Sequence, residues 1–378
     1  MPTIYFCAPP LTATATASKL TTQKAEQISE KGPFMQSLKQ TNMRQEIDEI
    51  PDATARLLDR SANAFAAAGA ALRVKDPAFV VTIARGSSDH AALFLKYAIE
   101  LTAGIPVASL GPSLASIYGA TLKLGGGAAL AISQSGKSPD IVAMTKATTS
   151  AGATSIALTN TMPSPLTEAC SHPLDIFAGP ETSVAATKSF VNSIVAGLAV
   201  LSEWTGDREL QRAVADLPKH FAQAAKIDWL DFATSVNEAE SLYVLGRGPA
   251  LAIANEAALK FKETTGIHAE AFSAAEVLHG PVAIVGSRFP VLALAARDAA
   301  EESVLKSAES LSSTGAVVYI TSKSAAKLKH LPFVETGHPL TDALALILPF
   351  YGLVEALSRA RGLNPDAPTH LKKVTETI

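Results

Sequence analysis

Short apolar runs alternate with helical patterns along most of this chain. From Phe79 onward the runs are rich in β-branched residues or bounded by Gly and Pro, which is typical of strands buried on both faces of a parallel sheet. Before them, the spacing of Ile47, Ile50 and Leu57 predicts helix. The pattern therefore predicts an α/β protein built from βαβ units. The expected strands lie at 79–85, 105–110, 128–135, 154–160, 174–178, 241–247, 289–296 and 316–322.

The strand pattern restarts in the second half of the chain, because the sequence repeats itself. Segment 84–105 aligns without gaps on segment 246–267, so that Arg85 meets Arg247, and the same register continues into the strands that follow. An internal repeat of this kind indicates tandem structural units. We therefore expect two similar α/β domains, one after the other.

The composition and the repeat together divide the chain into six parts. The N-terminal stretch is rich in Thr, Ala and Ser and has no sustained apolar face, and Met35 and Met43 are both plausible initiators. The expected parts are a poorly ordered extension over 1–42, a leading helical segment over 43–75, a first domain over 76–215, a connecting helix over 216–240, a second domain over 241–360 and a C-terminal tail over 361–378.

A cluster of hydroxyl side chains follows one of the expected strands. Ser133, Ser135 and Ser138 stand with Gln134 just before Pro139, which suits the first turn of a helix. Backbone N–H groups and hydroxyls at the positive end of a helix dipole form an anion site, and phosphate is the usual anion. The alternative is an ordinary Ser/Gly turn.

The repeat favours the anion site over the turn. At the matching positions of the second half the cluster becomes Ala295-Ala296-Arg297, whereas a cluster needed only to turn the chain should be needed twice. The phosphate loop of NTPases is excluded, because it needs a glycine where Ala131 stands. Ligands of open parallel sheets bind at the carboxyl ends of the strands, and Arg85-Gly86-Ser87-Ser88 would bring further hydroxyls to that edge.

The second half carries titratable residues of its own. Glu256, Lys260 and Glu263 fall on one stripe of a helix. The alternative is a solvated face with a surface ion pair, but the surrounding segment is apolar enough to be buried. His279 follows in a Gly/Ala/Ser context, where histidine is either a satisfied loop residue or an acid/base group. Phosphate donors in one half and Lys, Glu and His in the other predict proton transfer on a phosphorylated small molecule.

The composition narrows the class of protein. The 378 residues are 48% hydrophobic and 18% charged, which suffices for a large core, and the net charge of −3 gives no indication of nucleic acid or an anionic membrane as a partner. Two cysteines are too few for a disulfide framework and suit a reducing compartment. We expect no metal site, no apolar run of membrane-spanning length and no secretory signal, and hence a soluble cytoplasmic protein.

Five motifs together resemble a known family. In order along the chain they are ARGSSDHA, SQSGKSPD, GPETSVAATKSF, EAALKFKE and HAEAFSAAEVLHGP. They resemble the tandem sugar-isomerase (SIS) domains of the glucosamine-6-phosphate synthase family, from about Met43 to the C-terminus. The resemblance implies two tandem SIS domains, each a flavodoxin-like parallel sheet flanked by helices.

The resemblance also implies roles for individual residues. Glu263 would move a proton between C1 and C2 of the sugar with Lys260 beside it, and Lys373 would form an imine with the ketose. His279 would open the sugar ring from the neighbouring subunit, which implies a homodimer. No metal or organic cofactor is needed. Phosphate binding falls to Ser87, Ser88, Ser133, Gln134, Ser135 and Ser138, and we expect Arg85, Gly86, Ala185 and Glu256 to complete the substrate-binding set.

Three departures from the synthase change the expected reaction. The synthase begins with a glutaminase domain, and the stretch before the SIS region is too short to hold one. Arg85-Gly86-Ser87-Ser88, Lys137 and Ala186 replace the synthase's own residues and look most like the SIS-type glucosamine-6-phosphate deaminases. We therefore expect glucosamine 6-phosphate and water to give fructose 6-phosphate and ammonia.

Two kinds of alternative remain open at this point. One is an enzyme of the same fold that acts on galactosamine 6-phosphate or a glycated amino-acid phosphate, or that uses free ammonia in synthesis. The other is a catalytically silent sugar-phosphate sensor, against which the presence of Lys260, Glu263 and His279 argues.

Overall fold

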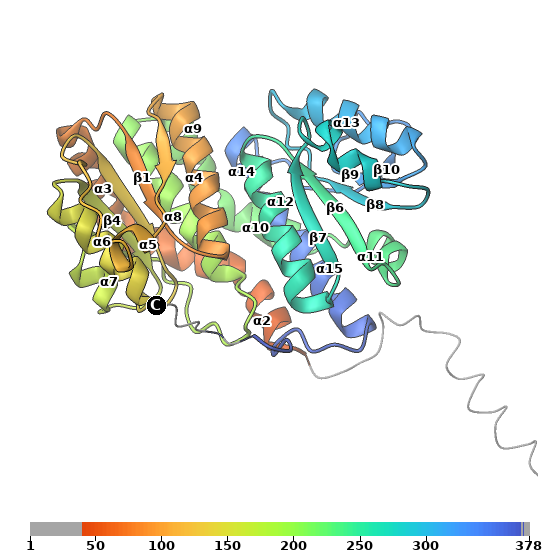
Figure 1. Ribbon diagram of the computed structural model, residues 1–378, viewed down its shortest axis with the longest axis horizontal. Coiled ribbons are helices and arrows are strands. Elements are labelled where there is room, and N and C mark those ends of the chain that lie inside the picture. The colour runs from red at the N-terminus through yellow and green to blue at the C-terminus, as the bar shows by residue number, and fades with distance from the viewer. Residues whose placement is uncertain (1–39, 372, 374–378) are drawn as a thin grey trace, which may run out of the picture. The chain divides into compact units, whose positions relative to one another are not determined.

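The computed structural model describes residues 40–371 and 373 (Figure 1). Most of the predicted N-terminal extension and the end of the predicted tail lie outside the described residues. The predicted α/β fold with two parallel sheets is confirmed, and the chain from Gln40 onward forms one compact unit.

The first sheet contains five parallel strands in the order β2-β1-β3-β4-β5. This is the flavodoxin-like order, in which ligands bind where neighbouring connections leave the sheet in opposite directions. β1 and β3 are adjacent at that point, and each is followed by a helix. The strands are β1 (Val80–Ile83), β2 (Val107–Ser109), β3 (Ala128–Ile132), β4 (Thr154–Thr159) and β5 (His172–Asp175).

Two layers of helices cover this sheet (Figure 1). One layer contains α3 (Ile50–Lys75), α4 (Ser87–Ala103) and α8 (Lys188–Thr205), and the other contains α6 (Pro139–Ser150) with the short helices α5 (Ser113–Ser116) and α7 (Pro165–Glu168). α9 (Arg208–Ala215) follows α8. The central strand β3 is buried along its whole length, as its continuous apolar run predicts.

The second sheet has the same strand order, β7-β6-β8-β9-β10. Its strands are β6 (Ser241–Gly246), β7 (His268–Ser273), β8 (Pro290–Ala293), β9 (Val317–Ile320) and β10 (Lys329–His330). Its helices are α12 (Pro249–Lys260), α13 (Glu301–Ser313), α14 (Pro339–Ala345) and α15 (Ile347–Ala360), and α12 packs against α4 of the first half.

Strands β7 and β10 were not among the strands expected from the sequence. β7 is an edge strand in which exposed His268 and Glu270 alternate with buried Ala269, so it lacks the apolar run of a central strand. In the register of the repeat, the expected strand at 105–110 aligns with 267–272. The repeat could therefore have predicted β7. β10 has only two residues and no sequence pattern of its own.

The region 216–240 holds two helices where the sequence predicted one. They are α10 (Leu217–Ala224) and α11 (Leu230–Val236). Between them the chain turns so that Trp229 is buried and its indole N–H donates to the carbonyl of Pro332 at 2.9 Å. Satisfying that buried donor stabilises the break in the helix.

One helical stretch matches a membrane span by length and composition alone. The stretch Pro339–Ala360, which spans α14 and α15, is long and apolar enough to cross a membrane. However, 89% of its most apolar window is buried inside the protein, as in the core helix of a globular domain. Length and hydropathy alone do not distinguish a membrane span from a buried core helix, whereas the packing of the helix does.

The leading helices and the tail meet beside the first domain. Thr41 caps α2 (Asn42–Asp48) by accepting from the N–H of Arg44 at 3.0 Å. The first N–H groups of α2 also donate to the carboxylate of Asp366, at 2.8 and 2.9 Å. The carbonyl of Asp366 accepts from Val184 N–H at 3.1 Å, so the tail also holds the loop that contains Val184.

Candidate functional site

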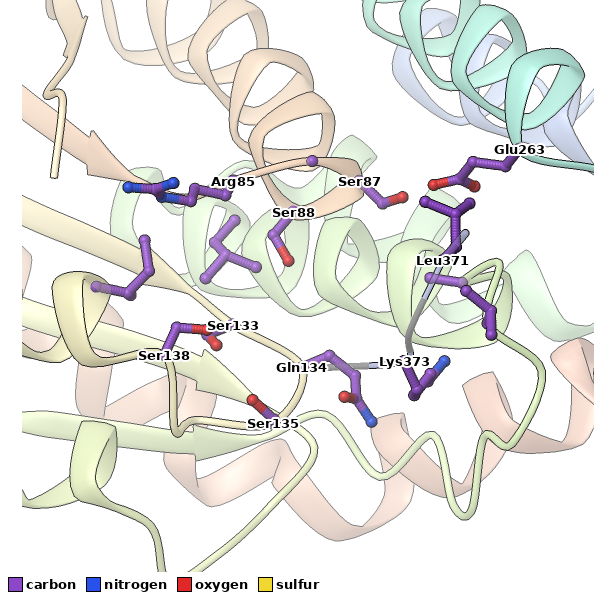
Figure 2. A pocket seen from close by; sticks show the side chains of 15 residues that line it. Arg85, Ser87, Ser88, Ser133, Gln134, Ser135, Ser138, Glu263, Leu371 and Lys373 are labelled. Carbon is purple, nitrogen blue, oxygen red and sulfur yellow. The ribbon is translucent and has the colours of Figure 1, made fainter. Parts of the chain in front are cut away.

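A cavity of about 350 Å³ lies at the carboxyl ends of β1 and β3 (Figure 2). It receives side chains from both halves of the chain and from the tail. Its lining consists of Arg85, Gly86, Ser87, Ser88, Ile132, Ser133, Gln134, Ser135, Ser138, Ile141, Val184, Ala186, Glu263, Leu371 and Lys373.

Helix α4 begins at the wall of this cavity. Gly86 precedes the helix with φ +57°, a left-handed conformation that favours glycine, and no side chain caps the helix. Ser87 and Ser88 are the first two residues of α4 and both line the cavity. Uncapped N–H groups, a positive helix end and two hydroxyls therefore face the same space.

The loop between β3 and α6 forms the opposite wall. Gly136 has φ +61°, and a Cβ at this position would collide with the side chain of Ser164, so the turn requires glycine. Ser138 precedes α6 without making a side-chain cap, and Pro139 starts the helix. The hydroxyl of Ser135 accepts from the N–H of Lys137 at 3.3 Å. This wall is a second uncapped helix N-terminus with hydroxyl groups, which suits an anion.

Arg85 adds positive charge at the same edge of the sheet. Its guanidinium pairs with the carboxylate of Asp140, a fully buried residue in the first turn of α6. Arg85 itself is 44% exposed and lines the cavity. The pair joins the two anion-binding segments, because Arg85 precedes α4 and Asp140 belongs to α6.

The second half contributes a buried lysine between two carboxylates. The ammonium of Lys260 lies 3.0 Å from Glu256 Oε1 and 2.8 Å from Glu263 Oε2, and it donates to the Ser87 hydroxyl at 2.9 Å. Burial alone would lower the pKa of Lys260, but the carboxylates of Glu256 and Glu263 outweigh it and raise the pKa. Lys260 is therefore a fixed positive charge beside the cavity.

Glu256 lies behind Lys260 and is completely buried. His90 Nδ1 lies 2.8 Å from its Oε2, and the hydroxyl of Tyr351 lies 3.5 Å from its Oε1. Burial alone would raise the pKa of Glu256, but Lys260 and His90 lower it below its usual value. Glu256 is thus a structural anion that holds Lys260 and does not reach the cavity.

Glu263 reaches the cavity because the end of α12 widens into a π-helix. The chain continues from Lys260 as a π-turn over Phe261–Thr265, which contains Glu263. Single π-turns of this kind often occur at functional sites. Glu263 is 20% exposed, and Figure 2 shows its carboxylate directed toward the side chain of Ser87.

Lys373 enters the cavity from the tail. Its ammonium donates to Ser183 O at 2.7 Å and lies 3.1 Å from Glu181, whose buried carboxylate also accepts from Ser189 Oγ at 2.6 Å. Burial alone would raise the pKa of Glu181, but Lys373 and the hydrogen bonds from Ser189 and Thr187 lower it. Glu181 therefore holds Lys373 as a further cation at the site, in addition to Arg85 and Lys260.

The structure brings most of the predicted site residues together in the cavity lining, with four exceptions. Ala185 is buried, while its neighbours Val184 and Ala186 line the cavity. His279 lies in a 3-10 turn (Val277–His279), is exposed, and does not line the cavity of its own chain. Lys260 and Glu256 stand behind the cavity wall rather than in it.

Sequence reasoning missed several residues that support the site. Asp140, Glu181 and His90 each lie inside a motif that resembles the SIS family, but the sequence assigned them no role, because their partners stand far away along the chain. Leu371 could have been found from its place next to Lys373 in the tail. Within residues 40–371 and 373, no group of three or more His, Cys, Asp or Glu is arranged to hold a metal ion.

Comparison with known sequences identifies the fold family. The profile of the SIS domain matches residues 76–202 and 235–334, more than half of the chain. The chain belongs to the SIS domain family. Among curated SIS relatives, it is similar to glutamine–fructose-6-phosphate aminotransferase (isomerizing) from Symbiobacterium thermophilum, with 32% identity over 78% of this chain and 51% of the relative. The same enzyme from Halobacterium salinarum is 33% identical over 77% of this chain and 50% of the relative.

The SIS chain spans about half the length of these curated relatives. Among solved structures, a provisionally named phosphosugar isomerase from Silicibacter pomeroyi DSS-3 is 53% identical, with a TM-score of 0.84 over 86% of this chain and 100% of that one. A glucosamine-6-phosphate deaminase from Thermotoga maritima is 19% identical, with a TM-score of 0.71 over 89% of this chain and 100% of that one, which shows the shared fold alone. The predicted SIS fold and the similarity to the aminotransferases are confirmed, and the deaminase assignment stays a prediction.

Proposed function

We propose that this chain is a phosphosugar isomerase that acts on an amino sugar phosphate and releases its nitrogen as ammonia. The favoured substrate is D-glucosamine 6-phosphate, which with water gives D-fructose 6-phosphate and ammonia. One observation carries the proposal: a single cavity joins the uncapped hydroxyl-rich loops of the first half to the Lys260–Glu263 pair of the second.

The loops supply binding energy away from the reacting carbons. The hydroxyls of Ser88, Ser133, Ser135 and Ser138 would donate to the phosphate at the ends of α4 and α6, with Arg85 as the nearby cation. Holding the phosphate fixes C1 and C2 of the open-chain sugar near Glu263. That positioning lowers the entropy cost of proton transfer.

Glu263 is the proton shuttle in this proposal. Its carboxylate takes the proton from C2 of the aldose, and the electron pair forms the C1–C2 double bond of an enolamine. The π electrons of the C1 carbonyl move to O1, which takes a proton from the ammonium group of the substrate. Returning the proton to C1 leaves an imine at C2. Water then adds to C2, and ammonia leaves to give the ketose. Lys260 would stabilise the negative charge that develops at O1. Lys373, which lines the cavity, would form the imine with the ketose that the family resemblance implies.

The loop residues favour nitrogen release, because Arg85, Lys137 and Ala186 resemble those of SIS-type deaminases. The 53% identical solved relative carries the name of a phosphosugar isomerase, which supports a sugar phosphate as substrate and does not distinguish isomerisation from nitrogen release. We place the protein in the cytoplasm, where its two cysteines would stay reduced. We also propose a homodimer in which His279 opens the sugar ring in the partner's cavity, since it does not line its own.

The decisive experiment is an ammonia-release assay on purified protein. Glucosamine 6-phosphate should release ammonia and yield fructose 6-phosphate, and Glu263→Gln should abolish both. If galactosamine 6-phosphate or a glycated amino-acid phosphate releases ammonia faster, that compound is the better candidate for the substrate. Consumption of free ammonia with fructose 6-phosphate would mark a synthetic enzyme. Tight binding of a sugar phosphate without any turnover would show a sensor and overturn the enzyme proposal.

A further inference from the structure

His90 is a first-domain residue that the proposed reaction does not yet use. It lies on α4 one turn after Ser87, and both side chains cross to α12 of the second half. Ser87 accepts from Lys260, and the His90 ring contacts Glu256 at 2.8 Å. The same helix therefore touches both members of the buried Glu256–Lys260 pair.

The chemistry of this contact determines which nitrogen carries the proton. Glu256 is paired with Lys260 and its pKa is lowered, so it is ionised and can only accept hydrogen bonds. Nδ1 of His90 must therefore be the donor. The exposed fractions of the side chains are 20% for Glu263, 1% for Lys260, 0% for Glu256 and 21% for His90, so the chain of contacts runs from the cavity through the core to His90.

Without His90, the positions of Glu256 and Lys260 would no longer be fixed. Lys260 is the cation shared by two carboxylates, and Glu256 is fully buried, so a free lone pair on Glu256 would be costly. Glu256 would then turn or draw Lys260 toward itself, away from Glu263 and Ser87. The donated Nδ1–H occupies Oε2 and leaves Oε1 for Lys260.

We infer that His90 is a positioning residue that fixes the Glu256 carboxylate by an Nδ1–H donor and so holds the Lys260 ammonium toward the cavity. This role rests on the proposed function. His90 does not line the cavity and would not touch the substrate. It would act on turnover through Lys260.

The first test compares turnover in two variants of the full chain. His90→Ala should lower kcat by roughly 10- to 100-fold, the range expected for an unpaired hydrogen bond to a buried charge, and KM should stay within a factor of about three. His90→Asn places its amide nitrogen near the position of Nδ1 and should restore most of kcat. His220→Ala, a half-buried histidine on α10, is the matched control and should keep wild-type kcat. Equal kcat in His90→Ala and His220→Ala, or no rescue by Asn, would overturn the inference.

The second test does not depend on turnover. Long-range ¹H–¹⁵N spectra of protein labelled at histidine should show His90 in the Nδ1–H tautomer, and Glu256→Gln should shift or lose that signal. A His90 ring in the Nε2–H tautomer, unaffected by Glu256→Gln, would overturn the inference. If the wild-type chain turns over no sugar phosphate, the proposed function fails, and this spectrum still decides whether Glu256 holds His90.

Discussion

The two SIS domains share a strand order but differ at the carboxyl edge of the sheet. After β3 the first domain has Ser133-Gln134-Ser135 and a cavity, and after β8 the second domain has Ala295-Ala296-Arg297. There the guanidinium of Arg297 pairs with Glu335 at 3.0 Å and with buried Asp342 at 2.8 Å. The second domain therefore has an internal ion pair at the edge where the first domain would bind the phosphate of a ligand.

The first helices of the two domains differ in the opposite sense. In the register of the repeat, Glu256, Lys260 and Glu263 of the second domain correspond to Phe94, Ala98 and Leu101 of α4. Phe94 and Ala98 are buried in the core, and α4 remains α-helical where α12 gives way to a π-turn. Each domain thus carries one part of the proposed chemistry and uses the positions equivalent to the other part for contacts within the protein. The comparison teaches that a repeat preserves backbone geometry while side chains divide the work.

The largest expected effect comes from removing the base of the second domain. Glu263→Gln keeps the size and hydrogen bonding of the side chain but not its basicity, so kcat should fall by about 10²–10⁴-fold while substrate still binds. Solvent deuterium should no longer enter C1 of the product. Leu101→Gln at the corresponding exposed position of α4 is the matched control and should retain wild-type turnover. If deuterium exchange continues at near wild-type rate in Glu263→Gln, Glu263 is not the base and serves only as the ion-pair partner of Lys260.

The next effect concerns the hydroxyls that occur in the first domain alone. Ser135→Ala or Ser138→Ala should raise KM for glucosamine 6-phosphate by roughly 10- to 150-fold, because each removes a hydrogen bond of about 1.5–3 kcal/mol to a charged phosphate. Steady-state kinetics with ammonia detection measures this change. An unchanged KM in both variants would remove these residues from the phosphate site.

Arg297 should behave oppositely to Ser135, although the two positions correspond. Arg297→Ala leaves buried Asp342 without its cation and should lower the free energy of unfolding by about 1–3 kcal/mol, while kcat/KM of the remaining folded protein stays unchanged. Urea unfolding of Arg297→Ala and Ser135→Ala, measured side by side, checks the contrast. If Arg297→Ala instead raises KM with no loss of stability, the second domain also binds ligand at this edge.

The smallest expected signal tests whether the second domain also serves a partner. His279→Ala and Glu263→Gln chains, each nearly inactive alone, are mixed after mild dissociation. Random exchange makes about half of the dimers mixed, each with one intact site of two, so roughly a quarter of wild-type activity should return. Gel filtration confirms that subunits exchanged. If no activity returns although exchange occurred, His279 acts in its own chain or not at all.

The sequence by itself determined the fold class and most of the candidate site. The apolar runs predicted the central strands, because a strand covered on both faces must be apolar throughout. The repeat located both domains, and the hydroxyl loop and Glu263 were found because they lie in local motifs, whereas Lys373 was expected from the family resemblance alone. Edge strand β7 was missed because exposed His268 and Glu270 interrupt its apolar pattern.

The tertiary structure alone decided which charges meet. His90, Asp140 and Glu181 lie in motifs that the sequence shows, but the charged partner of each stands far along the chain and only the fold reveals it. It also placed Lys260 behind the cavity wall and Glu263, which belongs to the π-turn after α12, in the cavity lining. Local patterns depend on neighbours a few residues apart, whereas a buried ion pair depends on how whole helices pack, and no short stretch of sequence contains that information.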